Sequence, residues 1–455
     1  MSGKKYSGSL VLYVTAAVAF FIFFVNQNSY AVPSFKRQTG LSCTACHTVY
    51  PELNNFGRHF KIMGYTMSKS NKPYDWPPPI SGVLKISYSH VDKDLPPGSV
   101  EDTWANISNS TKNDVVYAPK IAGIYYAGKI YDKLGAFIQA NYGGVDDNFF
   151  LDITDIRYAD MTPSRNFMYG IMVNNAPTLG DPWNSTPAWS FPYEGSDIAP
   201  TPAASPLIEG DLQEQQVGGA GLYGLFMNKL YVQASVYRSN RNGVTSVLGA
   251  GTDTTTVVDG AMPYWRIAFM HMWASHALEF GTYGMTADIY PEGMTYGNTN
   301  SFRDIGFDAQ YQYVTGKHTF SVAGAWIQER QDWDADFALG RASNNSTDLD
   351  KFRLNVNYFH RISLGSVGGI IGFFSINGDS DALMYTPDPI DGSRTGSPDS
   401  RWFIVEGDFV LYNQYKLALQ YVMYDKFNGA DSNYDGFGRD ASDNNTLYFL
   451  LRFMF

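Results

Sequence analysis

Apolar and polar residues alternate along most of the chain after residue 80. Within the stretch FRDIGFDAQYQYV (302–314), positions 305, 307, 309, 311 and 313 are apolar or aromatic, and the positions between them are Asp, Gly or Gln. FRLNVNYF (352–359) and WFIVEGDFVL (402–411) show similar alternation. Because successive side chains of a strand point to opposite faces, this pattern predicts strands with one apolar and one polar face.

About sixteen such segments are predicted, most of them about ten residues long, which is typical of strands that cross a membrane at a tilt. An even number of strands is what bacterial outer-membrane barrels have. We therefore predict an all-β fold, a transmembrane antiparallel β-barrel over 79–455. The strands are expected to start near Ile80, Lys120, Leu134, Leu151, Asn166, Gln216, Lys229, Tyr264, Ala277, Phe302, His318, Phe352, Leu364, Trp402, Tyr415 and Leu447.

The predicted connections alternate in length. Short ones, such as DKLG after Tyr131 and TGK after Val314, alternate with long ones such as 91–116, with a short connection at 143–148 as the exception. Short periplasmic turns and long external loops form the layout of an outer-membrane barrel. The Pro-rich connection 175–215 resembles the loop that folds into the lumen of general porins, with a variable external loop as the alternative.

The two ends of the chain also indicate export to the outer membrane. Lys4 and Lys5, an apolar run over 10–25 and a small-x-small site ending at Ala31 predict a signal peptide over 1–31. An uncleaved anchor is the alternative, but the run is short for a span of ~20 residues. The last nine residues, LYFLLRFMF, alternate and end on an aromatic residue, which resembles the insertion signal of outer-membrane barrels.

Composition agrees with a membrane barrel. Aromatic residues make up 16% of the chain, glycine occurs 43 times, and the net charge is −11. An acidic chain of this kind is not expected to bind nucleic acid and is suited to attract cations.

The only two cysteines, Cys43 and Cys46, are followed directly by His47. This C-x-x-C-H spacing is the attachment pattern of haem c, in which two thiols bind the haem vinyl groups and the histidine is the proximal iron ligand. A disulfide would leave the histidine unexplained. A zinc site would need further ligands, and a thioredoxin-type pair would need a βαβ context. We therefore predict one covalent haem c.

Residues 32–78 are predicted to form a small helical monohaem cytochrome c domain, with a helix from Pro51 to about Gly64. Roughly 45 residues are too few for a stable core, so haem and a surrounding barrel lumen would have to supply the rest. Three residues are candidates for the distal iron ligand, and a five-coordinate iron is a further alternative. The candidates are Met63, which we place first, His59 and Met67, with Arg58 and Lys61 as candidate partners of the haem propionates.

The stretch from Ala31 to Thr66 resembles the fused monohaem cytochrome–porin iron oxidases of Fe(II)-oxidising bacteria. The matching residues are Pro33, Phe35, Gln38, Thr39, Gly40, the C-x-x-C-H motif, Pro51, Leu53, Phe56, Gly57 and Arg58. The resemblance implies an outer-membrane Fe(II):cytochrome c oxidoreductase. It implies that the haem takes electrons from extracellular Fe(II) and passes them to a periplasmic cytochrome c or blue-copper protein.

The alternative function is a porin whose haem domain is a structural or redox-responsive plug. Five carboxylates are expected to face the lumen, where they would either bind Fe²⁺ as hard ligands or simply line the wall in pairs with arginines. The carboxylates are Glu279, Asp304, Asp308, Glu406 and Asp408, and the arginines are Arg266, Arg353 and Arg452.

Overall fold

The computed structural model describes residues 33–100, 103–106, 112–210, 212, 216–240, 256–292 and 294–455. The signal peptide expected over 1–31 lies outside these residues. Within the described residues, no helix has both the length and the apolar character that crossing a membrane requires.

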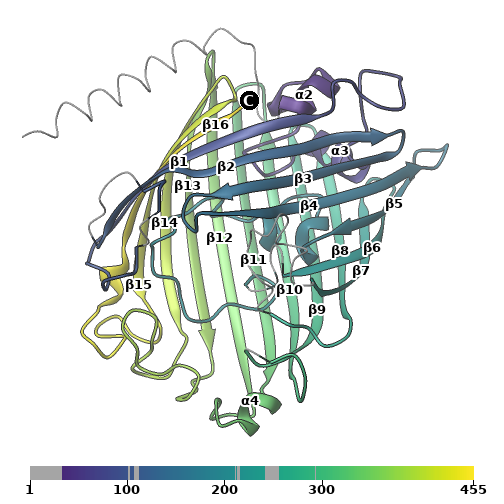
Figure 1. The fold of residues 1–455 in the computed structure, drawn as a ribbon. Helices are drawn as coiled ribbons and strands as arrows, with labels where there is room; N and C mark the ends of the chain where they lie inside the picture. The colour runs from purple at the N-terminus through teal and green to yellow at the C-terminus, as the bar shows by residue number, and fades with distance from the viewer. Residues whose placement is uncertain are drawn as a thin grey trace, which may run out of the picture.

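Sixteen antiparallel strands form one closed barrel, in which each strand pairs with its sequence neighbours and β1 also pairs with β16 (Figure 1). The predicted strand number and barrel class are therefore confirmed. The strands are β1 (Ile80–Val91), β2 (Asp114–Tyr131), β3 (Leu134–Gly143), β4 (Asn148–Met161), β5 (Phe167–Asn174), β6 (Val217–Phe226), β7 (Leu230–Ser239), β8 (Met262–Trp273), β9 (His276–Ile289), β10 (Asn300–Val314), β11 (His318–Asp332), β12 (Ser346–Ile362), β13 (Gly365–Gly378), β14 (Ser400–Leu411), β15 (Tyr415–Lys426) and β16 (Thr446–Met454).

Two strands, β2 and β12, begin six residues earlier than the alternation predicts. The other fourteen begin within three residues of their predicted starts. In β2, Pro119 lies at a register shift of the β1–β2 ladder, so the alternation breaks there. In β12, Asp348 and Asp350 extend the strand beyond its outward apolar residues, which begin at Phe352. Sequence alternation detects the part of a strand that contacts lipid and misses the part that continues past it.

The two faces of the barrel wall have opposite chemistry. On β10, the outward side chains of Ile305 and Phe307 are 40% and 49% exposed, whereas the inward carboxylates of Asp304 and Asp308 are 1% and 5% exposed. A soluble protein would place these residues the other way round. An apolar outer face and a polar inner face are what a barrel in lipid requires.

The two ends of the barrel differ in their connections. The two-residue turn between β2 and β3 and the equally short turn between β12 and β13 lie at the end that carries the C-terminus (Figure 1). Helices α2 (Pro33–Thr39) and α3 (Asn55–Ile62) lie at this same end. The long loops, including the one that holds α4 (Asp334–Ala338), lie at the opposite end. By the usual layout of such barrels, the short-turn end faces the periplasm.

The described part of the connection between β5 and β6, residues 175–210, 212 and 216, folds into the lumen, and we call it the lumen loop. It contains the short helices η2 (Pro177–Gly180) and η3 (Pro187–Trp189). Arg353 Nη2 on β12 donates to the Ser185 carbonyl at 2.6 Å, and the Leu207 amide donates to Glu329 Oε2 on β11 at 2.6 Å. Of the two sequence interpretations, the lumen position is therefore the correct one.

The closure of β1 on β16 generates a testable prediction. Phe455 and Gly82 exchange two backbone hydrogen bonds, and a Cβ on Gly82 would lie 2.5 Å from the Phe455 ring. We expect Gly82→Val to destabilise the folded barrel by ~1–3 kcal/mol because this junction is already filled. Gly407→Val is the matched control, since a Cβ there meets nothing within 4 Å.

The measurement is the fraction of purified barrel that migrates as the compact form on an unheated denaturing gel over a urea series. Gly82→Val should lose the compact form at lower urea than Gly407→Val. Equal midpoints for the two variants would show that the packing of Phe455 does not hold the junction.

Candidate functional site

Residues 33–78, which we call the N-terminal segment, enter the lumen at the short-turn end. Arg58 donates to the Gln312 side chain on β10, and Tyr65 OH donates to Asp155 Oδ2 on β4 at 2.5 Å. Tyr223 OH on β6 donates to the Ile62 carbonyl at 2.7 Å. Because these partners come from different parts of the wall, residues 58–65 lie inside the barrel, whereas Tyr74 and Trp76 near the end of the segment stay 52% and 81% exposed.

Helix α3 begins at Asn55, four residues later than predicted. Residues 48–52 instead form a turn, closed by a hydrogen bond from the Thr48 amide to the Glu52 carbonyl at 3.2 Å. The Asn54 side chain then caps the helix by accepting from the Gly57 amide at 3.1 Å. The predicted end is correct, since Gly64 has a φ of +67°, as a residue just after a helix often has.

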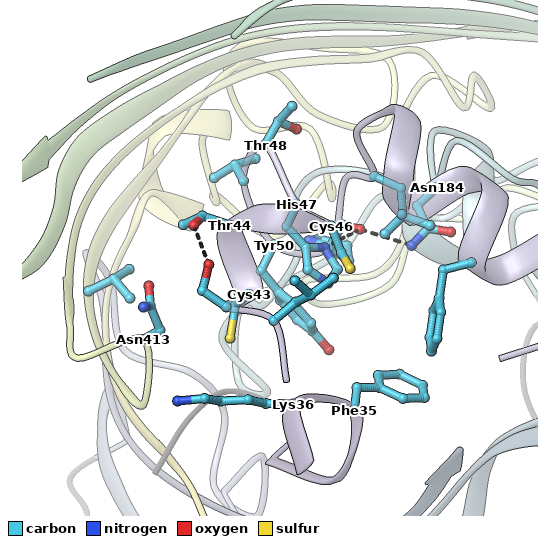
Figure 2. Close-up of a pocket in the computed structure, with 18 of the residues that line it drawn as sticks. Phe35, Lys36, Cys43, Thr44, Cys46, His47, Thr48, Tyr50, Asn184 and Asn413 are labelled. Carbon is cyan, nitrogen blue, oxygen red and sulfur yellow. Dashed lines mark hydrogen bonds between the residues drawn. The ribbon is translucent and has the colours of Figure 1, made fainter. Parts of the chain in front are cut away.

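Cys43, Cys46 and His47 line one cavity between the N-terminal segment and the barrel wall (Figure 2). The short helix η1 (Cys43–Ala45) presents the first thiol. The empty space in the cavity is about 1340 Å³ with the open solvent at its mouth included. Most of the wall is apolar or aromatic, and it includes Phe35, Leu41, Leu53, Phe60, Phe137, Trp189 and Phe359.

The ring of His47 is held through one nitrogen. Its Nδ1 lies 3.3 Å from the Pro51 carbonyl oxygen and 3.2 Å from the Glu52 carbonyl oxygen. Nδ1 is therefore the protonated nitrogen, which leaves the lone pair on Nε2. Burial lowers the pKa of His47 to about 4, so the imidazole is neutral, as a metal ligand must be.

The turn beneath His47 requires a glycine in α3. A Cβ on Gly57 would lie 2.3 Å from the Cys46 carbonyl oxygen and 2.9 Å from Leu53 Cδ2. Only a residue without a side chain lets the helix approach the backbone of the motif this closely. Gly57 thus fixes the distance between α3 and the two thiols.

The carboxylate of Glu52 anchors this turn to the barrel. It is buried and accepts four hydrogen bonds: from Ser321 Oγ at 2.8 Å, Asn357 Nδ2 at 2.7 Å, Tyr193 OH at 3.0 Å and Thr48 Oγ1 at 3.1 Å. Burial raises the pKa of Glu52, while the four hydrogen bonds oppose that rise. The residue whose carbonyl holds His47 is therefore fixed by β11, β12 and the lumen loop together.

The predicted distal ligands do not lie at the cavity. Met63 packs against buried residues of the wall, His59 Nδ1 faces the Asn55 carbonyl at 2.8 Å, and Met67 is exposed. Arg58 is buried among Gln312 and Met270, away from the cavity wall. Of the predicted accessory residues only Lys61 lines the cavity, where its Nζ donates to the Asp181 carbonyl and to Asn184 Oδ1, both at 2.7 Å.

Three further cationic side chains, which the motif did not predict, also line the cavity. Lys36 comes from α2, Lys416 from β15 and Arg452 from β16. The Arg452 guanidinium lies 4.6 Å from the centre of the Tyr50 ring. Lys416 and Arg452 fall on the polar face of their strands. The strand alternation placed Arg452 in the lumen and could have placed Lys416 there, but it could not place either residue at this cavity.

The five predicted lumen carboxylates all face inward, and they are occupied by protein partners. Arg266 contacts Asp308 at 2.9 Å and Glu279 at 3.1 Å, and it also contacts Asp181 of the lumen loop at 3.1 Å. Lys416 contacts Glu406 and Asp408, each at 2.9 Å. Asp304 Oδ2 accepts from the Ile208 amide at 2.8 Å. Pairing with wall cations is therefore confirmed for four of the five carboxylates, through Arg266 and Lys416. Two of the three predicted arginine partners are wrong, because Arg353 contacts Glu209 and Arg452 lies over the Tyr50 ring. Within the described residues, no group of three or more His, Cys, Asp or Glu could hold a metal ion.

A closed sixteen-strand antiparallel barrel with an apolar outer face and a filled lumen defines a porin-like barrel of the bacterial outer-membrane type. No protein-family profile matches the chain, and no curated protein matches it.

Several solved outer-membrane proteins are similar to the chain in structure. The anion-selective porin from Comamonas acidovorans aligns with a TM-score of 0.47 and 11% identity over 83% of this chain and 98% of the porin. The outer-membrane channel DcaP of Acinetobacter baumannii aligns with a TM-score of 0.45 and 10% identity over 83% of this chain and 96% of its own. A loop-deletion mutant of OmpT, an outer-membrane protein of Vibrio cholerae, aligns with a TM-score of 0.45 and 9% identity over 83% of this chain and 98% of the OmpT chain.

The Glu52 anchor generates a second prediction. Glu52→Ala removes the acceptor of four buried donors. Because Asn357 Nδ2 keeps Ser321 Oγ and Tyr193 OH as acceptors, we expect the docked segment to lose ~3 kcal/mol rather than the full sum, since each buried group left unsatisfied costs roughly 1–3 kcal/mol. Protease added from the periplasmic side should then cleave residues 33–78 up to ~100-fold faster, because cleavage follows the population of the released state.

Glu52→Gln is the matched control, because it keeps the side-chain length and one acceptor oxygen. The cleavage rate of Glu52→Gln should lie between the rates of the wild-type protein and Glu52→Ala. Equal cleavage rates in all three proteins would mean that the carboxylate does not hold the segment in the lumen.

Proposed function

We propose that the protein carries one covalent haem c in the cavity and transfers electrons through the outer membrane, from Fe²⁺ outside the cell to a soluble carrier in the periplasm. One observation carries this proposal: both thiols of the C-x-x-C-H motif and its histidine line one largely apolar cavity. Bound haem would supply a one-electron Fe(III)/Fe(II) couple.

The residues present fit the group. Cys43 and Cys46 would form the two thioethers, and His47 would offer Nε2 because its Nδ1 is held by two backbone carbonyls. Apolar and aromatic side chains would exclude water from the macrocycle. Lys36, Lys61, Lys416 and Arg452 line the cavity and would face the carboxylates of the haem, whereas the predicted Arg58 does not line it.

The distal position is open in this proposal. None of Met63, His59 and Met67 lies on the cavity wall. All seven histidines of the chain are described, and only His47 lines the cavity. The structure therefore gives none of the three predicted distal ligands a place at the cavity, and His47 is the residue that would hold the iron.

A buried column of aromatic rings supports a route between the two membrane faces. It starts at Tyr193, whose hydroxyl is bonded to Glu52, and it ends at Tyr434 in the external loop between β15 and β16. A closely packed aromatic interior is a suitable medium for electron transfer. The ring-centre distances are 5.4 Å for Tyr193–Phe191, 6.2 Å for Phe191–Phe374, 5.1 Å for Phe374–Trp402, 5.8 Å for Trp402–Tyr424, 4.9 Å for Tyr424–Phe427 and 4.7 Å for Phe427–Tyr434.

Iron as the electron donor follows from the resemblance of residues 31–66 to the cytochrome–porin iron oxidases. Cell physiology is consistent with it, because Fe³⁺ formed outside the barrel stays outside. The lumen carboxylates are paired, so Fe²⁺ would react at the external surface or near the end of the aromatic column rather than at an acidic site in the lumen.

A plugged porin is the second candidate, and the barrel architecture favours it. The N-terminal segment and the lumen loop meet through a hydrogen bond from the Leu53 amide to the Trp183 carbonyl at 3.3 Å. Together they fill a lumen that in a porin of this size is an aqueous channel. In this reading the haem has a structural or regulatory role, and release of the segment would open the pore.

The test is stopped-flow spectroscopy of the oxidised, purified protein mixed with Fe²⁺ under anaerobic conditions at mildly acidic and neutral pH. We expect the haem spectrum to change to its reduced form, with dithionite giving the full amplitude. If dithionite reduces the haem and Fe²⁺ does not, the iron-oxidation reading is wrong and the plugged porin stands.

A conductance measurement on the same preparation separates the two candidates further. In planar bilayers the electron-transfer reading predicts a closed wild-type barrel in both redox states. A wild-type barrel whose conductance rises on reduction would contradict that reading and support a redox-gated pore.

A further inference from the structure

Four of the seven histidines lie outside the cavity on the outer face of the barrel, within a few residues of a short turn on either side of it. His271 and His276 flank the turn between β8 and β9, His318 begins β11, and His360 lies two residues before the end of β12. Their neighbours Thr319 and Phe359 are buried in the lumen, so His318 and His360 point outward. This band belongs neither to the cavity nor to the aromatic column.

His318 and His360 lie directly opposite each other in the β11–β12 register. Their ring centres are 4.9 Å apart, and the two Nδ1 atoms are 3.5 Å apart. That distance is at the long limit for a hydrogen bond, so a shared proton holds the pair only weakly. Tyr358 OH lies 2.9 Å from the same His318 Nδ1, which brings three polar atoms toward one point.

The separation of the two nitrogens matches what one metal ion requires. Zinc binds imidazole nitrogen at about 2.0–2.1 Å in tetrahedral geometry, which places two such nitrogens about 3.4 Å apart. Imidazole is a preferred ligand of Zn²⁺, Cu²⁺ and Ni²⁺. The geometry points to a binding site for a divalent transition-metal ion at His318 and His360, formed across two neighbouring strands.

The surroundings suit an open site. The described residues contain no group of three or more His, Cys, Asp or Glu that could hold a metal, so the remaining positions belong to Tyr358 and water. His360 is two residues from the strand end, within ~7 Å of the turn at about 3.3 Å per residue. The interfacial layer on each side of the hydrocarbon is of similar thickness, so water and ions reach the pair. A bound ion would cross-link β11 and β12 at the periplasmic rim.

The test titrates Zn²⁺ alone into the purified full-length barrel, washed with a chelator and kept in detergent, and follows the binding heat. We expect one Zn²⁺ site in the wild-type protein, and we expect its affinity to fall more than about 10-fold in both His318→Ala and His360→Ala. Loss of a metal ligand should lower the affinity at least as much as loss of a residue that supports a ligand. The unheated-gel mobility of each variant shows that its barrel is folded.

His276→Ala is the matched control. His276 Nδ1 also lies near a cross-strand tyrosine hydroxyl, Tyr311 OH at 2.7 Å, but it has no imidazole opposite it in the β9–β10 register. This variant should bind Zn²⁺ as the wild-type protein does. The proposed site would be overturned if His318→Ala and His360→Ala bound Zn²⁺ with wild-type affinity. It would also be overturned if His276→Ala lowered the affinity as much as they do.

Cu²⁺ provides an independent check through its electron paramagnetic resonance spectrum. The wild-type protein should show coupling of the copper to two nitrogens, which is lost in either single variant. A wild-type spectrum without nitrogen coupling would also overturn the site.

Discussion

A sixteen-strand barrel encloses more space than its own inward side chains can fill, and the rest of this structure depends on how that space is occupied. Two chain segments enter it from opposite ends, the N-terminal segment from the short-turn side and the lumen loop from the long-loop side. Their backbone and charged groups leave water when they do so. They are stable there because wall residues of the opposite kind receive them: Arg266 contacts Asp181, and Ser321 and Asn357 donate to Glu52.

The same pairing determines the chemistry of the cavity. Glu52 receives its four hydrogen bonds through its side chain while its backbone carbonyl faces His47 Nδ1. The orientation of the imidazole is thus set by strands far away in the sequence. Gly57 brings α3 against the Cys46 carbonyl from the other side. A motif of five residues, which has no fixed geometry by itself, becomes a rigid arrangement of two thiols and one nitrogen because the barrel surrounds it.

How far the sequence predicts this structure depends on the range of the interactions involved. Local alternation, as in 302–314, predicts strands and their inward residues, because it reflects the two faces of the wall directly. It did not predict the early start of β12, where the strand leaves the lipid. Helical spacing placed Met63 and His59 on one face of α3 but could not tell which face meets the cavity. That choice is made by contacts such as Arg58 with Gln312, which are separated by hundreds of residues. Lys416 and Arg452 reach the cavity only because the barrel closes.

The central claim is that Cys43 and Cys46 hold a covalent haem inside a membrane barrel, and the most direct measurement is the haem-dependent peroxidase stain of the denatured, electrophoresed outer-membrane protein. The account predicts a stained band for the wild-type protein whose two thiols resist alkylation, and an unstained band for Cys43→Ala/Cys46→Ala that still forms a compact barrel when unheated. An unstained wild-type band with two alkylatable thiols would contradict it.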